Sequence, residues 1–232
     1  MAVSVFARQQ ETLFQEYRVR LEFRDRIYGG CPSDPKIIEG WLRSKAGISV
    51  ETEVQQAVLR TLRELGHDID PDATYEQVSE AIREVADERQ VNRFKTDDDG
   101  LYVEGRQVKA MLKECCNIMF AGERWGRTKK GPRNFLAERI FVKPDRIHLG
   151  ALAPSGIDTF VCHTVGRDGP RSSLNAVEYV VHPTVEFVVW SLNNEVTEDQ
   201  WASIWVAAQE NGLGARRSQQ GGQFDVTLWE RA

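Results

Sequence analysis

The stretch NGLGARRSQQGGQFDVTLW, residues 211–229, joins an expected helix to an expected strand through a glycine-rich loop. Glycine tolerates positive φ and lets a backbone approach another chain closely. Arg216, Arg217 and Ser218 lie in the middle of this loop. Because guanidinium groups, hydroxyls and loop amides are frequent phosphate ligands, these three residues are candidate contacts for a phosphate backbone. The alternative interpretation is a solvated turn.

A second stretch, GLYVEGRQVKAMLK at residues 100–113, predicts a short strand that turns into a helix through Gly105. Arg106, Lys109 and Lys113 follow at helical spacing, so they share one face of that helix. The positive end of the helix near Arg106 favours an anion. The sequence therefore predicts a second phosphate-binding surface, with an ordinary hydrated helix face as the alternative.

Residues 121–134 form a third basic segment, rich in glycine and predicted to be a loop. Cations in such a loop follow phosphates, while a tryptophan ring stacks on a base. The alternative is a mobile basic loop whose tryptophan is buried in the core. The candidate nucleic-acid contacts in this segment are Arg124, Trp125, Arg127, Lys129, Lys130 and Arg133.

The overall composition argues against a uniformly basic protein. The chain has 232 residues, is 41% hydrophobic and carries a net charge of −5. The charge is uneven, since residues 47–100 hold 14 acids and 6 bases (net −8) and residues 106–146 hold 11 bases and 4 acids (net +7). A chain that separates its charges in this way can present a basic face despite an acidic total.

Periodicity predicts an α+β fold. Apolar and charged residues alternate over 17–24, helical patterns fill residues 32–95, and strand patterns occupy most of 139–192. A capping box at Thr197 starts a helix, and residues 224–229 form a closing strand. This order suits an antiparallel sheet with helices on one face, and a ferredoxin-like (RRM-like) core is among the possibilities. We predict an N-terminal arm (1–16), a core (17–31 and 96–232) and an acidic helical insertion (32–95).

Cysteine usage predicts a cytoplasmic protein with reduced thiols. The four cysteines include no CxxC pair, and the two adjacent ones cannot readily bridge each other. The sequence contains no apolar run long enough to predict a membrane segment. We expect no metal and no cofactor, and we find no residue pattern typical of side-chain catalysis.

The two opening stretches resemble motifs of the RAMP superfamily, the modified RRM-like proteins of CRISPR effector complexes. Gly105 aligns with the glycine that precedes the first helix of the family, and Val108-Lys109 aligns with its Leu-Lys pair. Arg106 and Gln107 replace a serine pair. Residues 212–226 are similar to the family's C-terminal glycine-rich loop in order and spacing. The resemblance implies a ferredoxin-like core with insertions that binds single-stranded RNA along its backbone.

The favoured hypothesis is a non-catalytic protein that binds single-stranded RNA, with DNA as a further possibility. It would self-associate or join a multi-subunit nucleoprotein complex, as backbone subunits of the family do. One alternative is an RNA-processing endonuclease of the same superfamily. Asp34 is a weak catalytic candidate, because some family members cleave RNA with an aspartate in a comparable loop, but a helix N-cap role also fits it. The other alternative is an assembly protein that keeps the fold without nucleic acid.

Overall fold

The computed structural model describes residues 13–32, 35–41, 43, 50–70, 72–85, 91–127, 129–166, 169–192 and 195–232. Contacts between Cα atoms divide the chain into two compact units. Unit 1 comprises Met1–Ile27, Val103–Gly150 and Val181–Ala232, and unit 2 comprises Tyr28–Tyr102 and Ala151–Val180. In this division residues 151–180 are grouped with the helical segment, while the predicted arm, core and insertion stay a prediction.

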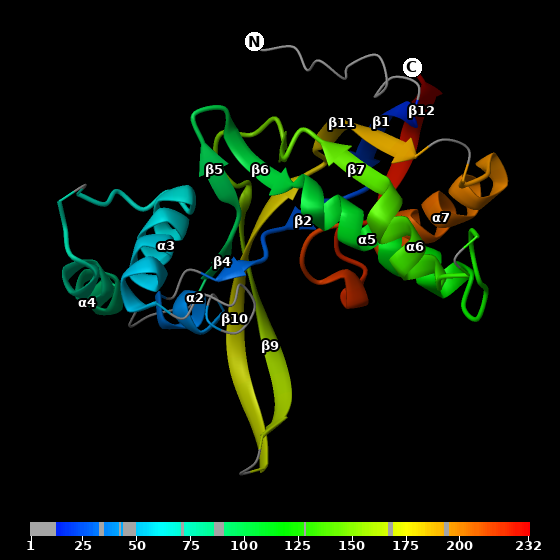
Figure 1. The fold of residues 1–232 in the computed structure, drawn as a ribbon. Coiled ribbons are helices and arrows are strands. Elements are labelled where there is room, and N and C mark those ends of the chain that lie inside the picture. The colour runs from blue at the N-terminus through cyan, green and yellow to red at the C-terminus, as the bar shows by residue number, and fades with distance from the viewer. Residues whose placement is uncertain are drawn as a thin grey trace. The chain divides into compact units, whose positions relative to one another are not determined.

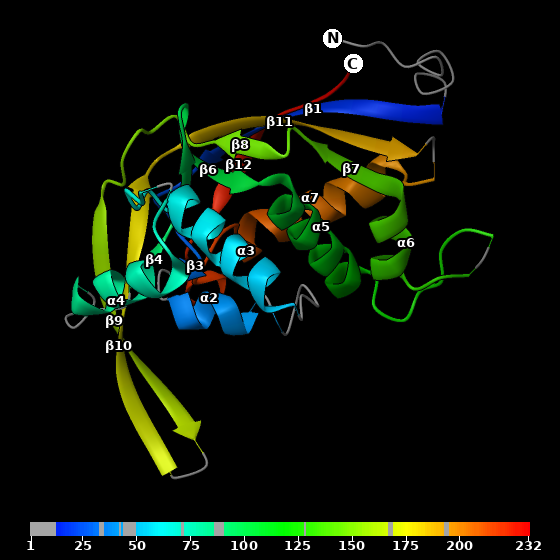
Figure 2. The same cartoon turned by 60° about the vertical axis from the view of Figure 1, so that its left-hand side comes forward.

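Unit 1 is built on a four-stranded antiparallel sheet in the order β12-β1-β11-β7. Helices α5, α6 and α7 lie on one side of this sheet (Figures 1 and 2). Apart from α6 and β8, the elements of unit 1 follow one another along the chain in the order β1, α5, β7, β11, α7 and β12. This connectivity and the strand order of the sheet are those of a ferredoxin-like fold. The predicted fold class is therefore confirmed. The elements are β1 (Phe14–Phe23), α5 (Gly105–Met119), α6 (Pro132–Arg139), β7 (Ile140–Lys143), β8 (Arg146–His148), β11 (Thr184–Leu192), α7 (Glu198–Asn211) and β12 (Phe224–Arg231).

The alternation of β1 explains how the sheet packs on its helices. Tyr17, Val19, Leu21 and Phe23 are buried, while most of the intervening side chains are at least partly exposed. The Tyr17 ring stacks on Trp229 of β12 with 4.2 Å between ring centroids. Alternate residues of β1 therefore supply the core beneath the helices and leave a second, charged face.

Helix α7 begins at the capping box that the sequence predicts. Thr197 Oγ1 accepts from Gln200 N–H at 3.2 Å, and Gln200 Oε1 accepts from Thr197 N–H at 2.9 Å. Trp201 and Trp205 then lie on the buried face, at 1% and 5% exposure. Both tryptophans therefore belong to the core of unit 1.

Unit 2 combines short helices with a long two-stranded ribbon. In the ribbon, β9 pairs with β10 in antiparallel register, and β10 pairs in parallel with β4. The ribbon extends well beyond the helices of its own unit (Figure 1). The elements are β3 (Cys31–Pro32), α2 (Pro35–Trp41), α3 (Glu51–Glu64), α4 (Tyr75–Val85), β4 (Val91–Arg93), β5 (Lys95–Asp97), β9 (Gly156–Gly166) and β10 (Gly169–Val181), while β2 (Arg26–Tyr28) and β6 (Gly100–Glu104) run across the boundary between the units.

The helices of unit 2 pack around a small core of their own. Its members come from the apolar stripes of α2, α3 and α4 and from the residue that follows α3. A capping box at Thr74 precedes α4, with Gln77 Oε1 accepting from Thr74 N–H at 2.9 Å. The buried core residues are Ile38, Val54, Val58, Leu62, Leu65 and Val78.

Glu178 of β10 gives unit 2 a buried carboxylate. Its Oε2 accepts from Phe94 N–H at 3.0 Å, and its Oε1 lies 3.8 Å from Arg93 Nε. Burial raises the pKa of Glu178 above its ordinary 4.5, although the Phe94 hydrogen bond and the Arg93 charge lower it. The folded chain therefore holds this proton more tightly than the unfolded chain does. The resulting stabilisation is fully present below the ordinary pKa and is lost as pH rises through the raised pKa.

We expect Glu178→Gln to flatten the pH dependence of the unfolding free energy above pH 4.5, because it removes this titration. Urea unfolding of the full chain at several pH values measures the effect. The exposed Glu53→Gln variant is the control and should keep the wild-type profile. An unchanged profile for Glu178→Gln would contradict the assignment.

Candidate nucleic-acid interface

The glycine loop, residues 212–223 between α7 and β12, is closed by its own backbone. Gly212 N–H donates to the Ala208 carbonyl and Leu213 N–H donates to the Gly222 carbonyl, both at 2.9 Å. Gly212 and Gly222 have φ values of 74° and 75°. A Cβ on Gly222 would lie 1.8 Å from the Leu213 carbonyl oxygen. Loop closure is therefore sufficient to explain these two glycines.

Arg216 and Arg217 lie at the turn of the glycine loop, where the chain forms a short 3-10 helix, η2 (Arg217–Gln219). Arg216 has left-handed φ of 60°, and its carbonyl accepts from Gln219 and Gly221. Arg217 Nη1 donates to Glu114 Oε2 on α5 at 2.8 Å. Because a guanidinium carries five N–H donors, this contact leaves others to meet an anion.

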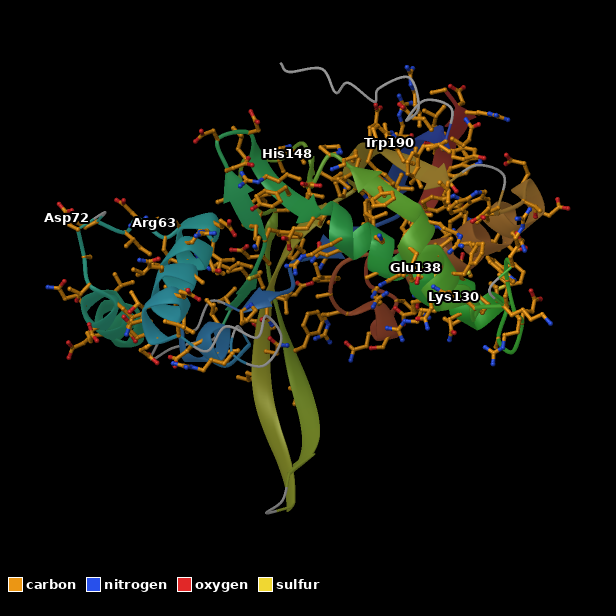
Figure 3. All side chains as sticks on the ribbon, in the orientation of Figure 1. Arg63, Asp72, Lys130, Glu138, His148 and Trp190 are labelled. Atoms are coloured by element: carbon orange, nitrogen blue, oxygen red, sulfur yellow. The ribbon has the colours of Figure 1, made fainter. Side chains whose placement is uncertain are left out.

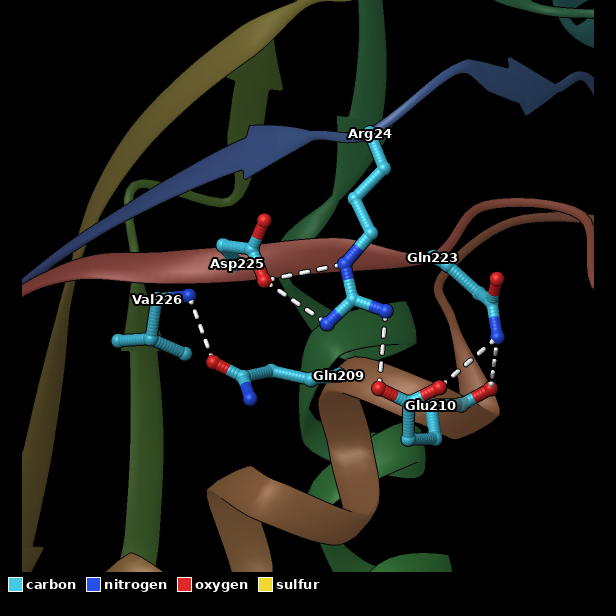
Figure 4. Close-up of polar contacts among 6 residues, drawn as sticks. All are labelled: Arg24, Gln209, Glu210, Gln223, Asp225 and Val226. Carbon is cyan, nitrogen blue, oxygen red and sulfur yellow. Dashed lines mark hydrogen bonds and ion pairs between the residues drawn. The ribbon is translucent and has the colours of Figure 1, made fainter.

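A polar network around Arg24 fixes the two stems of the glycine loop (Figure 4). Arg24, just after β1, contacts Glu210 Oε1 and Asp225 Oδ1, each at 2.8 Å. Gln223 Nε2 donates to the Glu210 carbonyl at 3.2 Å and to Glu210 Oε2 at 3.1 Å. Since Glu210 lies in the last turn of α7 and Asp225 at the start of β12, the network holds the end of the helix to the strand. The sequence does not indicate this network, because its partners are far apart in the chain.

Helix α5 begins at Gly105, and its N-cap is Glu104. Glu104 N–H donates to Gln107 Oε1 at 3.1 Å. Gln107 is one of the two departures from the family pattern, and it satisfies a backbone donor at the start of the helix. Arg106 is exposed and contacts Glu104 Oε2 at 2.6 Å through Nη2. Gly105 packs closely, because a Cβ there would lie 3.0 Å from the Pro144 carbonyl oxygen.

Lys109 and Lys113 lie one turn apart on α5, and both are partly exposed. Lys109 Nζ lies 4.9 Å from the centroid of the Phe141 ring, a cation–π geometry. Burial lowers the pKa of Lys109, and the charge of Lys113 lowers it further. Lys113 is next in sequence to Glu114, the partner of Arg217. Helix α5 and the glycine loop therefore bring two of the predicted cationic segments together.

In the third segment, Trp125 does not present its ring to solvent. It is 6% exposed, its ring packs against Phe120 and Phe135, and its Nε1 donates to Glu123 Oε2 at 2.7 Å. Backbone hydrogen bonds between Trp125 and Lys130 close a hairpin. The prediction that Trp125 stacks on a base is therefore corrected, because its ring is buried against Phe120 and Phe135.

The cations of this segment differ in their surroundings. Lys130 is bound to Glu138 of α6 at 2.5 Å, and the two side chains lie together in Figure 3. The remaining cations of the segment are exposed, and Lys129 has φ of 49°. Arg133 lies in the first turn of α6, a helix that the sequence prediction missed. The exposed cations are Arg124, Arg127, Lys129 and Arg133.

The described part of the interface offers cations and hydrogen-bond donors for an anion. Ser218 is exposed beside Arg217 at the turn of the loop. The thiols of Cys115 and Cys116 on α5 are fully buried. Burial raises the pKa of Cys116 to about 12, so this thiol is a poor nucleophile. Asp34, the weak catalytic candidate, lies outside the described residues.

Comparisons with known proteins identify a distant structural neighbour. No protein-family model matches the chain, and no curated protein matches it. A solved structure described as type III-B Cmr-beta bound to cognate target RNA contains a similar chain, with 14% sequence identity and a TM-score of 0.45. The match covers 96% of this chain but 62% of the neighbour, so the present chain spans less than two thirds of that protein.

The described helices give no candidate for a membrane span, since none combines sufficient length with sufficient apolar character.

Proposed function

We propose that this chain binds single-stranded RNA through the phosphate backbone, as a RAMP-like subunit of a multi-subunit nucleoprotein complex. The observation that carries the proposal is the ion pair between Arg217 and Glu114 at 2.8 Å. It holds the cationic turn of the glycine loop on α5, the helix that carries Lys109 and Lys113. Two stretches about a hundred residues apart, each proposed to contact phosphates, thus lie together in one ferredoxin-like unit.

The binding surface comprises α5, the glycine loop and the cations of the 121–134 segment, including Lys130, which is paired with Glu138. Its contacts would go to phosphates rather than to base edges, because lysine and arginine side chains dominate it. Its proposed members are Arg106, Lys109, Lys113, Arg124, Arg127, Lys129, Lys130, Arg133, Arg216, Arg217 and Ser218.

Salt dependence tests the proposal. For a single strand, log K falls against log salt concentration with a slope of about −0.7 for each phosphate neutralised. We expect a slope of about −2 or steeper for a fluorescein-labelled 20-nucleotide oligouridylate, corresponding to roughly three phosphates or more. Fluorescence anisotropy from 50 to 300 mM salt measures it. An absence of binding at 50 mM salt, or binding with no slope, would contradict the proposal.

A self-association role has some support of its own from charge. The exposed face of α3 includes Glu51 and Glu53, and α4 exposes Glu76 and Glu80. These acids could meet the basic segment of a second copy, and such a contact would weaken with salt. Light scattering after size exclusion at two salt concentrations, with the 260/280 nm absorbance ratio, distinguishes a nucleic-acid-free assembly from a nucleoprotein.

A further inference from the structure

Strand β9 lies at the edge of its sheet in unit 2. Among the described residues it pairs with β10 alone, over its whole length from Gly156 to Gly166. Strand β10, in contrast, also has β4 beside it at Ala176 and Val177. The ribbon of β9 and β10 runs out past the helices of unit 2 in both views (Figures 1 and 2). The outer side of β9 is therefore a sheet edge of 11 residues, about 35 Å long.

The edge of β9 lacks the features that usually protect an exposed strand from pairing. Such features are proline, lysine and β-bulges. Strand β9 reads GIDTFVCHTVG, which contains no proline, lysine or arginine, and its register with β10 runs without a shift. Strand β10 has both Pro170 and Arg171 before it reaches β4. One edge of the ribbon is thus protected by its sequence, and the edge of β9 is not.

One face of the ribbon exposes three large apolar side chains. Ile157 is 54% exposed, Val161 is 57% exposed and Leu174 is 61% exposed. They share this face because Val161 is directly opposite Leu174, and Ile157 is four residues from Val161 in the same strand. A two-stranded ribbon is only marginally stable in water, and added strands with an apolar face stabilise it. The ribbon therefore gains stability from pairing at its open edge.

The sequence of β9 is self-complementary about Val161. Two antiparallel copies of the strand, with Val161 opposite its own counterpart, would place glycine opposite glycine and apolar residues opposite apolar residues. The one carboxylate of the strand would face a threonine, so like charges do not meet. The directly opposite pairs would be Val161–Val161, Phe160–Cys162, Thr159–His163, Asp158–Thr164, Ile157–Val165 and Gly156–Gly166.

We propose that β9 pairs with β9 of a second copy of this chain, antiparallel about Val161, to form a two-fold symmetric dimer with a four-stranded sheet. A two-fold interface brings the same surface of both copies together, so it requires the self-complementarity that this register has. An edge with one acid and no lysine or arginine does not suit a nucleic acid. The contact also differs from the association of acidic helices with a basic segment considered above. It joins backbone groups and apolar side chains, so salt should not weaken it.

Sedimentation velocity of the full chain, freed of nucleic acid, tests the dimer at about 0.15 M and about 1 M salt. We expect a species of twice the 26.4 kDa chain mass at both salt concentrations. Val161→Lys places two ammonium groups opposite each other on the symmetry axis, and should raise the dissociation constant of the dimer about 10-fold or more. Leu174→Lys is the matched control, because Leu174 is exposed on the same face but lies on β10, away from the paired edge. It should keep the wild-type dissociation constant.

Disulfide trapping tests the register. In a chain with Cys162→Ser, the variant Val161→Cys should form a disulfide-linked dimer on mild oxidation, because directly opposite Cα atoms are about 4.5–5.5 Å apart. Leu174→Cys in the same chain is the control. Three strand spacings, about 14 Å, would separate it from its counterpart, which is too far for a disulfide. Equal cross-linking of the two variants would contradict the register.

A wild-type chain that is monomeric at both salt concentrations would overturn the inference. A dimer that dissociates at about 1 M salt and ignores Val161→Lys would overturn it too, and would point to the charged association instead. Circular dichroism confirms that each variant is folded. If the wild-type chain is monomeric and Val161→Lys weakens oligouridylate binding, the ribbon contacts nucleic acid and the inference fails. The proposed function is tested separately, because a wild-type chain that dimerises without binding the oligouridylate would contradict RNA binding alone.

Discussion

Gly222→Ala is expected to lower the free energy of unfolding of the full chain by about 2–5 kcal/mol, from left-handed strain and from overpacking. Gly222 has φ of 75°, where an L side chain is strained. A Cβ would also lie 1.8 Å from the Leu213 carbonyl oxygen, so the backbone must move. That movement would break the hydrogen bond from Leu213 N–H to the Gly222 carbonyl, which closes the glycine loop.

Gly150→Ala separates strain from the clash. Gly150 has φ of 70°, but a Cβ there would meet nothing within 4 Å. We expect this variant to lose only about 1–2 kcal/mol, the strain contribution alone. Urea unfolding followed by tryptophan fluorescence measures both variants. Equal losses would contradict the closed geometry of the glycine loop. If Gly222→Ala, at a low urea concentration where it is still folded, binds RNA more weakly than the wild-type chain, the geometry of the glycine loop also matters for RNA binding.

Trp201→Ala is expected to lower the free energy of unfolding by about 3–5 kcal/mol, the range for truncating a large buried aromatic. Trp201 is 1% exposed on α7, and its ring lies 6.1 Å from Tyr17 and 5.2 Å from Trp229 between ring centroids. Its removal leaves a cavity between the helix and the central strand of the sheet. The same packing positions α7, from which the glycine loop leaves.

Trp201→Phe tests whether ring volume or the indole N–H matters. Among the described residues, Trp201 Nε1 has no hydrogen-bond partner, so losing this donor carries no hydrogen-bond penalty. We expect a loss of about 1 kcal/mol from the smaller ring alone. Thermal and urea unfolding of the two variants give the comparison. A Trp201→Ala loss as small as that of Trp201→Phe would show that the site relaxes to fill the cavity.

Much of the unit 1 fold follows from local patterns. The alternation in β1 and the capping box at Thr197 are short-range features, and both are present in the structure. The sequence analysis misses helix α6, because glycines and cations dominate the residues just before it. Pro132 could have indicated the helix, since proline is common at the first position of a helix. Strand β4 escapes it because three residues, Val91–Arg93, are too few to display a period of two.

The candidate site was less accessible to sequence reasoning, because its decisive features join distant residues. Composition identifies Arg217 and the α5 cations, but not the contact of Arg217 with Glu114. For Trp125 the sequence pattern is misleading. A tryptophan among cations is typical of a base-stacking site, but its ring packs on Phe120 and Phe135. A cluster of three aromatic rings also depends on strand register. Phe14, Phe141 and Trp190 belong to three segments that only the sheet brings together.

The most direct test of backbone binding is the salt slope of a double variant, Lys113→Ala with Arg217→Ala. Removing two phosphate contacts should make the slope for the oligouridylate shallower by about 1.4. Arg60→Ala with Arg63→Ala, which removes two exposed cations from α3, is the control and should keep the wild-type slope. An unchanged slope for the Lys113 and Arg217 variant, with wild-type affinity, would contradict the account.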